Sequence, residues 1–140
     1  MSRLISDETW AVLTIWAEAR GEVQLGRIAV AEVIRNRTAV AHLGCHTVAA
    51  TVLAPYQFSC WNTRDPNRLT AALLDDADLL VRACRDAWRE AEDGSAVANE
   101  ALYYLNPQVV RDLPAWVDDC DEVAQIGRHR FYRPKGRRNG

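Results

Sequence analysis

The sequence predicts an α+β domain that is mainly α, with helices over its first two thirds and a small antiparallel β-sheet near the C-terminus. Apolar residues recur at helical spacing as far as Gly94, and beyond it the pattern changes to short runs rich in β-branched and aromatic residues. A chain of 140 residues is long enough to bury a core of its own. We therefore expect one domain over residues 1–140.

The first helix is expected over about residues 7–20. Ser6 can cap its start, and Gly21 can end it. The 3-4 spacing predicts one buried stripe. Its members are Trp10, Leu13, Trp16 and Ala17. Glu18 then borders this stripe in the last turn, which is an unusual place for a carboxylate.

Two further helices are predicted before residue 55. The spacing over 24–37 predicts a helix that turns Glu32 and Arg35 outward. Its buried side chains are expected to be Val30, Val33 and Ile34. Thr47 can cap a short helix that runs to Leu53 and is stopped by a proline.

The longest helix is predicted over about residues 69–93, after an aromatic segment at 56–61 and a loop at 62–67. Apolar side chains recur along it at 4-3-4-3-4 spacing. They are Leu73, Ala77, Leu80, Cys84, Ala87 and Ala91. We expect this helix to be the scaffold on which the others pack.

Three short strands are predicted after Gly94. They cover 101–105, 123–126 and 128–132, and Gly127 separates the last two. Because neighbouring side chains of a strand point to opposite faces, only one of Tyr103 and Tyr104 can face a groove, and we favour Tyr104.

Composition excludes a membrane-spanning protein. The chain is 49% apolar and 26% charged, and no apolar run approaches the ~20 residues that a membrane span needs. The first residues show no apolar leader segment, so we expect no secretory signal.

Charge is distributed unevenly along the chain. Six of the 17 basic residues lie in a basic C-terminal tail over 128–140, whereas the preceding body carries 11 basic and 19 acidic residues. The tail can attract a polyanion such as an anionic cell envelope, or it can be a solvated extension. Both interpretations stay open.

The cysteines and histidines do not have the spacing of a structural zinc site. Cys45, Cys60, Cys84 and Cys120 are far apart, and the cluster of His42, Cys45 and His46 does not complete a ligand set. We expect no metal and no cofactor. Cys84 is expected to be a buried apolar residue, and a Cys45–Cys60 disulfide stays open for an oxidising compartment.

Several separate blocks, in order over about residues 10–133, carry a resemblance to one family. The first block is Ala17-Glu18-Ala19-Arg20-Gly21-Glu22, followed by Gly26, 29–31 and 33–37. The middle block is Gln57-Phe58-Ser59-Cys60-Trp61. The closing blocks are Tyr103-Tyr104, Asn106-Pro107, Pro114 with Trp116, and Ile126-Gly127-x-His129-x-Phe131-Tyr132. Together they resemble the SleB-type cell wall hydrolases. At 95–100 the chain departs from the turn with proline and glycine that this family tends to have.

The resemblance implies a lysozyme-like helical domain that cleaves peptidoglycan between N-acetylmuramic acid and N-acetylglucosamine. In related lytic transglycosylases one glutamic acid protonates the glycosidic oxygen, and the muramic acid C6 hydroxyl closes a 1,6-anhydro ring. The same carboxylate can then accept the hydroxyl proton. Such an acid needs burial to raise its pKa. Attack by water instead would make the enzyme a muramidase.

The resemblance assigns the catalytic role to Glu18. The substrate-binding residues are expected to be Glu22, Gln57, Trp61, Tyr104 and Asn106. Glu22 can serve as a structural anchor on backbone amides or an arginine, or as a second carboxyl. Asn106 can form a turn or bind substrate, and His129 can contact a ligand or bond to backbone. We assign Trp10, Trp16, Trp88 and Trp116 to the core.

Two other classes of function stay open. A peptidoglycan amidase or peptidase would use zinc or a Cys/His pair such as Cys45 with His46 or Cys60 with His129. A non-enzymatic module would bind a polyanion through the basic tail.

Our preferred hypothesis is a monomeric phage endolysin that acts on glycan strands and does not bind nucleic acid. It would stay in the host cytoplasm until a holin releases it. The alternative is an enzyme of the bacterial envelope or spore.

Overall fold

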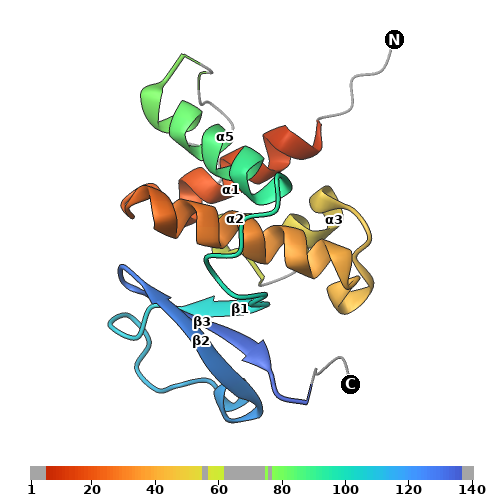
Figure 1. Cartoon of the computed structure of the whole chain (residues 1–140), viewed down its shortest axis with the longest axis vertical. Coiled ribbons are helices and arrows are strands. Elements are labelled where there is room, and N and C mark those ends of the chain that lie inside the picture. Colours follow the sequence, from red (N-terminus) through yellow and green to blue (C-terminus); the bar gives the residue numbers. More distant parts are fainter. Residues whose placement is uncertain (1–5, 55–56, 62–74, 76, 137–140) are drawn as a thin grey trace.

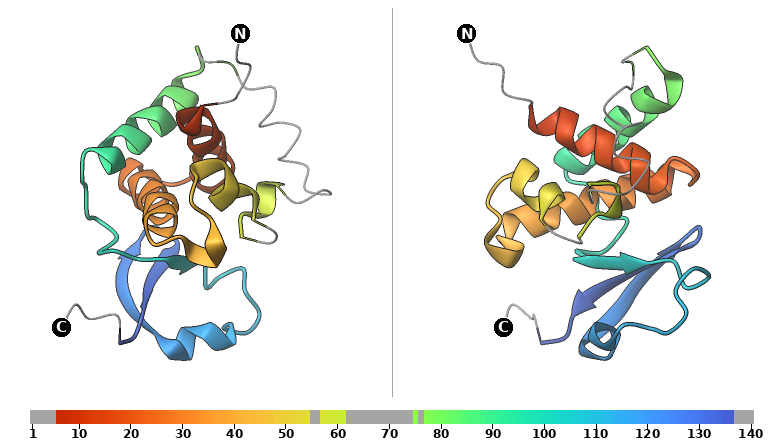
Figure 2. Two further views of the ribbon diagram at one scale, coloured as in Figure 1. Left: turned by 90° about the vertical axis from the view of Figure 1, so that its right-hand side faces the viewer. Right: turned by 180° about the vertical axis from the view of Figure 1, so that it is seen from behind.

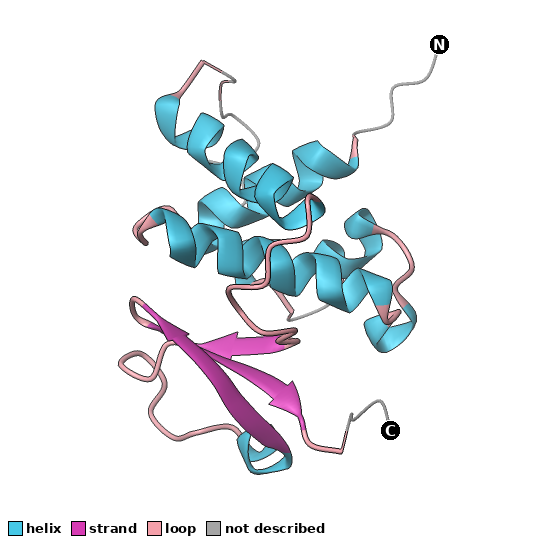
Figure 3. Cartoon of the chain, in the orientation of Figure 1, coloured by secondary structure: helices cyan, strands magenta, loops and turns pink. Residues whose placement is uncertain are grey.

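The computed structural model describes residues 6–54, 57–61, 75 and 77–136, and shows the mainly helical α+β fold that the sequence predicts. The α-helices are α1 (Asp7–Ala19), α2 (Gln24–Ala39), α3 (Val48–Leu53) and α5 (Leu79–Glu92), and short 3-10 turns are η1 (His42–Gly44), η2 (Ser59–Trp61) and η3 (Ala115–Asp119). The sheet consists of β1 (Tyr103–Leu105), β2 (Cys120–Ile126) and β3 (His129–Pro134). The helices pack together at one end of the molecule, and the sheet lies on the side of α2 that faces away from α5 (Figure 1, Figure 3).

Local capping explains where the first helices begin. Ser6 Oγ accepts a hydrogen bond from the amide of Thr9 at 3.2 Å, and Thr47 Oγ1 accepts one from Ala50 at 3.1 Å. These contacts satisfy amides that have no partner within the helix. The predicted caps of α1 and α3 are therefore confirmed.

The buried stripe of α1 differs from the prediction. Its buried side chains include Ala11, Ile15 and Ala19, at spacings of four, with Val12, Thr14 and Trp16 beside them. Of the predicted stripe only Trp16 is buried, whereas Trp10, Leu13 and Ala17 are partly buried at the edge of the core. Helix α1 is apolar around most of its circumference, so spacing alone did not select the deeper face.

Helix α2 is buried on two sides because it lies between the other helices and the sheet (Figure 2). Arg35 is exposed as predicted, but the prediction that Glu32 points outward is wrong, since Glu32 is only 3% exposed. Its carboxylate accepts hydrogen bonds from the Ser95 hydroxyl at 2.6 Å and from the amides of Val97 and Ala98, each at 2.9 Å. Glu32 thus anchors the segment between α5 and β1 to helix α2.

Helix α5 begins later than predicted. Asp78 caps it by accepting hydrogen bonds from the amides of Leu80 and Val81, and Asp75 and Ala77 lie outside the helix. The predicted positions 69–74 lie outside the described residues. Helix α2 contacts α1, α3, α5, β2 and η1, so it is the central helix in place of the predicted 69–93 helix.

The sheet is antiparallel with the order β1-β3-β2. Strand β2 begins at Cys120, three residues before the prediction, and is irregular between Glu122 and Ala124. The start of the predicted basic tail is the central strand of this sheet, because β3 covers His129–Pro134. No helix among the described residues is long and apolar enough to cross a membrane.

Candidate active site

A pocket of about 310 Å³ lies where the end of α1, the turn into α2 and the β2–β3 hairpin meet. It opens to solvent, and its polar side chains are Glu18, Arg20, Glu22, Asn106, Arg128 and His129. Glu18, Glu22 and Asn106 were predicted as site residues, so the fold brings Asn106 beside two acids that lie more than 80 residues earlier in the chain. The pocket combines two acids with two arginines beside an apolar core.

Glu18 is held by the neighbouring strand. The hydroxyl of Tyr104, in β1, donates a hydrogen bond of 2.6 Å to Glu18 Oε1. Burial, followed by the charge of Glu18 and this hydrogen bond, raises the pKa of Tyr104 well above its ordinary value. The phenol therefore stays protonated at neutral pH and remains a hydrogen-bond donor to Glu18.

Tyr103 and Tyr104 point to opposite faces of β1, as the strand period predicts. Tyr104 packs against Phe131 and His129 with ring centroids 5.6 and 5.0 Å apart. Tyr103 lies on the other face against Trp116, with ring centroids 5.0 Å apart. Of these two tyrosines, Tyr104 is the one that bonds to Glu18.

Glu22 joins the α1–α2 turn to the hairpin. Its side chain is 6% exposed, and Arg128 donates to it from the backbone amide at 3.1 Å and from Nε at 2.9 Å. Gly127 allows this approach, because its φ is +58° and an added Cβ would lie 2.5 Å from Glu22 Oε1. Burial acts to raise the pKa of Glu22, but the two hydrogen bonds and the charges of Arg128 and His129 outweigh it and lower the pKa.

His129 lines the pocket and is 9% exposed. Its Nδ1 is 3.9 Å from Glu22 Oε1, and within the described part of the chain this nitrogen has no hydrogen-bond partner. Nδ1 therefore does not make the backbone bond that was one of the two alternatives for His129. Burial lowers the pKa of His129, although the charge of Glu22 acts in the opposite direction.

Of the other predicted site residues, Asn106 lines the pocket, whereas Trp61 and Gln57 do not. Asn106 lines the pocket and also forms a turn, since its Oδ1 accepts from the amide of Gln108 at 2.9 Å. The indole of Trp61 donates to Thr14 Oγ1 at 2.8 Å, one helical turn before Glu18, and its ring is half-buried. Gln57 is also half-buried and does not line the pocket.

Sequence reasoning missed the two arginines of the pocket. Arg20 lies over the Trp16 ring at 4.3 Å and donates to the carbonyl of Ala17 at 3.1 Å. Arg128 was counted with the basic tail, although its place next to a turn glycine is the signal that could have separated it. Arg20 and Arg128 give the pocket its positive charge.

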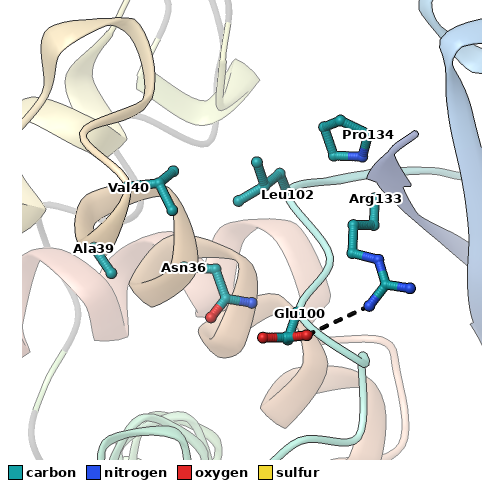
Figure 4. Close-up of a pocket in the computed structure, with 7 residues that line it drawn as sticks. All are labelled: Asn36, Ala39, Val40, Glu100, Leu102, Arg133 and Pro134. Atoms are coloured by element: carbon teal, nitrogen blue, oxygen red, sulfur yellow. Dashed lines mark hydrogen bonds and ion pairs between the residues drawn. The ribbon is translucent and has the colours of Figure 1, made fainter. Parts of the chain in front are cut away.

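A second pocket of about 270 Å³ lies between the end of α2, the segment before β1 and the end of β3. Arg133 and Glu100 face one another at 3.4 Å on one wall, and Val40 and Pro134 contribute apolar surface (Figure 4). None of the predicted site residues lines it.

No cluster of three or more metal-ligating side chains occurs in the part of the chain that the structure describes. Cys84 is buried in α5, and burial raises the pKa of its thiol to about 11, which fits an apolar role. Cys45 and Cys60 do not form a disulfide.

Comparison with known proteins points to one family. Residues 21–132 match the model of a family described as Cell Wall Hydrolase. Spore cortex-lytic enzymes are 29% identical over 119 residues in Bacillus cereus and 32% identical over 120 residues in Oceanobacillus iheyensis. These alignments cover 84% of the chain but only 40% and 38% of the two relatives.

Two solved structures share the fold. One is the catalytic domain of the germination-specific lytic transglycosylase SleB from Bacillus anthracis, with a TM-score of 0.73 and 25% identity over 95% of this chain and 100% of that one. The other is the catalytic domain of the Bacillus cereus SleB protein, with the same TM-score and identity over 95% of each chain. The similarity thus covers nearly the whole chain.

Proposed function

The chain belongs to the cell wall hydrolase family, and from that premise we propose that it cleaves the glycan strand of peptidoglycan, with Glu18 as the single acid and base. The observation that carries the proposal is the Glu18 carboxyl, hydrogen-bonded by Tyr104 at 2.6 Å at the edge of an open pocket. The similarity to SleB catalytic domains supports it further.

The proposed reaction needs one proton carrier. Protonated Glu18 gives its proton to the oxygen that joins N-acetylmuramic acid to N-acetylglucosamine, and the bond from the muramic acid C1 to that oxygen breaks. The C6 hydroxyl of the same muramic acid then bonds to C1, and its proton returns to the Glu18 carboxylate. Protons balance over the cycle, and the product carries a 1,6-anhydro ring.

Tyr104 fits this scheme as a neutral donor. When Glu18 loses its proton, the Tyr104 hydroxyl donates to the carboxylate at the distance already present. A hydrogen bond to a charged acceptor is about twice as strong as one between neutral groups. The contact therefore stabilises the ionised form that the first step creates.

Glu22 is assigned to support rather than to chemistry. Arg128 engages both of its oxygens, so the carboxylate already has charge-assisted partners. A group held in this way keeps its negative charge and is a poor general acid. We therefore assign a single-carboxyl mechanism.

Replacing Glu18 by Gln tests the proposal, because the amide keeps the shape of the side chain but cannot donate a carboxyl proton. We expect this variant to lose solubilisation of purified sacculi while its thermal unfolding stays normal. Glu8→Gln is the matched control on the same helix, since Glu8 is a surface residue paired with Arg89. Full activity of Glu18→Gln would contradict the assignment.

Mass spectrometry of the released muropeptides tests the reaction class. Anhydro ends indicate the intramolecular route, and ends heavier by one water indicate a muramidase. Release of free peptides with intact glycan would instead indicate an amidase or peptidase.

The phage-endolysin role stays a prediction of the sequence. Expression inside a bacterium, with and without a holin, tests it by the turbidity of the culture. Lysis that depends on the holin would support the role.

A further inference from the structure

Arg37 is a buried cation on the face of α2 that meets β1. Its side chain is part of a residue that is 5% exposed, and its Nε donates to the carbonyl of Leu102 at 2.6 Å. The guanidinium lies 4.9 Å from the centre of the Phe58 ring and 5.7 Å from that of Tyr103. Burial lowers its pKa, but an arginine stays charged inside proteins.

This charge is poorly compensated by direct contacts. Within the described residues, no carboxylate lies within 4 Å of Arg37, and its buried Nη1 has no hydrogen-bond partner. Buried charges are costly unless they are paired. A position that only required packing would be filled better by an apolar side chain, so the charge calls for an explanation.

Glu18 is the carboxylate whose negative charge acts to raise the pKa of Arg37. Leu102, which holds the Arg37 Nε, comes two residues before Tyr104, and Tyr104 binds Glu18. The charges of Arg37 and Glu18 attract one another across the residues between them. The charge of Arg37 also acts to lower the pKa of Tyr104. Arg37 is therefore bonded to the chain just before β1, the strand whose Tyr104 binds Glu18.

We infer that Arg37 is a positioning residue whose buried positive charge stabilises the Glu18 carboxylate at the moment it gives up its proton. The inference rests on the proposed function, because it concerns the ionisation of the same acid. Arg37 does not touch the substrate pocket. It acts through Tyr104 and through the low-dielectric interior, where a charge is felt over a longer distance than in water.

Other titratable groups lie near Glu18, Tyr104 or Arg37, and their charges must be kept the same in every variant. Beside Glu18 they are Arg20 and Glu22 in the turn after α1, Tyr104 on β1, and Arg128 and His129 on the hairpin. Cys60 in η2 acts on Tyr104, Tyr103 lies against Arg37, and His42 in η1 packs against Tyr103. All of them are retained in the variants below.

The experiment removes the charge of Arg37 in two ways. Arg37→Gln keeps some polarity, and Arg37→Met keeps the apolar stem, so at least one neutral variant is expected to fold. Arg37→Lys keeps the charge. Arg35→Gln is the matched control, because it removes one charge from an exposed position on the same helix.

Two readouts are measured on the full chain. The titration of the Glu18 side-chain carboxyl is followed by carbon NMR, and the pH profile of sacculus cleavage is recorded. Both neutral variants are expected to move the Glu18 midpoint and the falling limb of kcat/KM upward by about one pH unit, a change of the size that a unit charge produces in a protein interior. Their maximal rate should fall about tenfold.

Arg37→Lys and Arg35→Gln are expected to titrate as the original chain does. Folded neutral variants with an unmoved Glu18 midpoint would overturn the inference, and so would an equal shift in Arg37→Lys. If the original chain did not cleave sacculi, the proposed function would be wrong, whereas the NMR titration would still decide whether Arg37 acts on Glu18.

Discussion

The hydrogen bond from Tyr104 to Glu18 makes the sharpest prediction. Tyr104→Phe removes one hydroxyl and keeps the ring that packs against Phe131 and His129. A bond of 2.6 Å to a carboxylate contributes about 1.5–3 kcal/mol, provided the acceptor is charged. Because the carboxylate forms only as the proton is transferred, the loss should appear in the rate, as a decrease of roughly 10- to 150-fold.

The assay is the initial rate of soluble glycan release from purified sacculi at saturating substrate. Tyr103→Phe is a matched control, since Tyr103 lies on the opposite face of the same strand and contacts Trp116. We expect this control to stay within about twofold of the original rate. Urea unfolding of both variants tests whether the fold is kept. If Tyr104→Phe is stable and as active as Tyr103→Phe, the hydroxyl does not assist the acid.

Two further predictions concern stability. Glu32→Gln should lower the free energy of unfolding in urea by about 2–4 kcal/mol, because a buried backbone amide loses its acceptor and the charge-assisted bonds weaken. The exposed Glu122→Gln should change it by less than about 0.5 kcal/mol, and equal effects would contradict the role of Glu32. Acid should also destabilise the chain. Because the pKa of His129 is lowered in the folded state, folding stability should decrease as the pH falls through 6.5. Because the pKa of Glu22 is also lowered, stability should decrease further as the pH falls below 4.5 towards the folded-state pKa. Urea titrations from pH 8 to 3 measure both steps, and Glu22→Gln should abolish the lower one.

Local signals predicted much of the fold. The caps of α1 and α3 and the turn at Gly127 depend on a few neighbouring residues, and the structure contains all three. The opposite orientation of Tyr103 and Tyr104 follows from the pleat of a strand. The start of α5 was not predicted, because an apolar spacing can continue past the residue that caps a helix, and here Asp78 caps it.

Contacts between residues far apart in the chain could not be predicted from local spacing. Glu32 was expected in solvent because an amphipathic helix is assumed to have one buried face, whereas α2 is covered on two sides. Arg37 continues the spacing of Val30, Val33 and Ile34, and this was the signal that could have marked it as buried.

By itself, the sequence determined the succession of helices and strands, the ends set by capping residues, and the choice of Glu18 through its resemblance to a family. Only the tertiary structure decided which partners bind Glu18 and the neighbouring Glu22. Tyr104 is 86 positions away along the chain, and Glu22 and Arg128 are separated by 106. The physical reason is that secondary structure follows from interactions between near neighbours, whereas the environment of a carboxyl depends on whatever the folded core brings beside it.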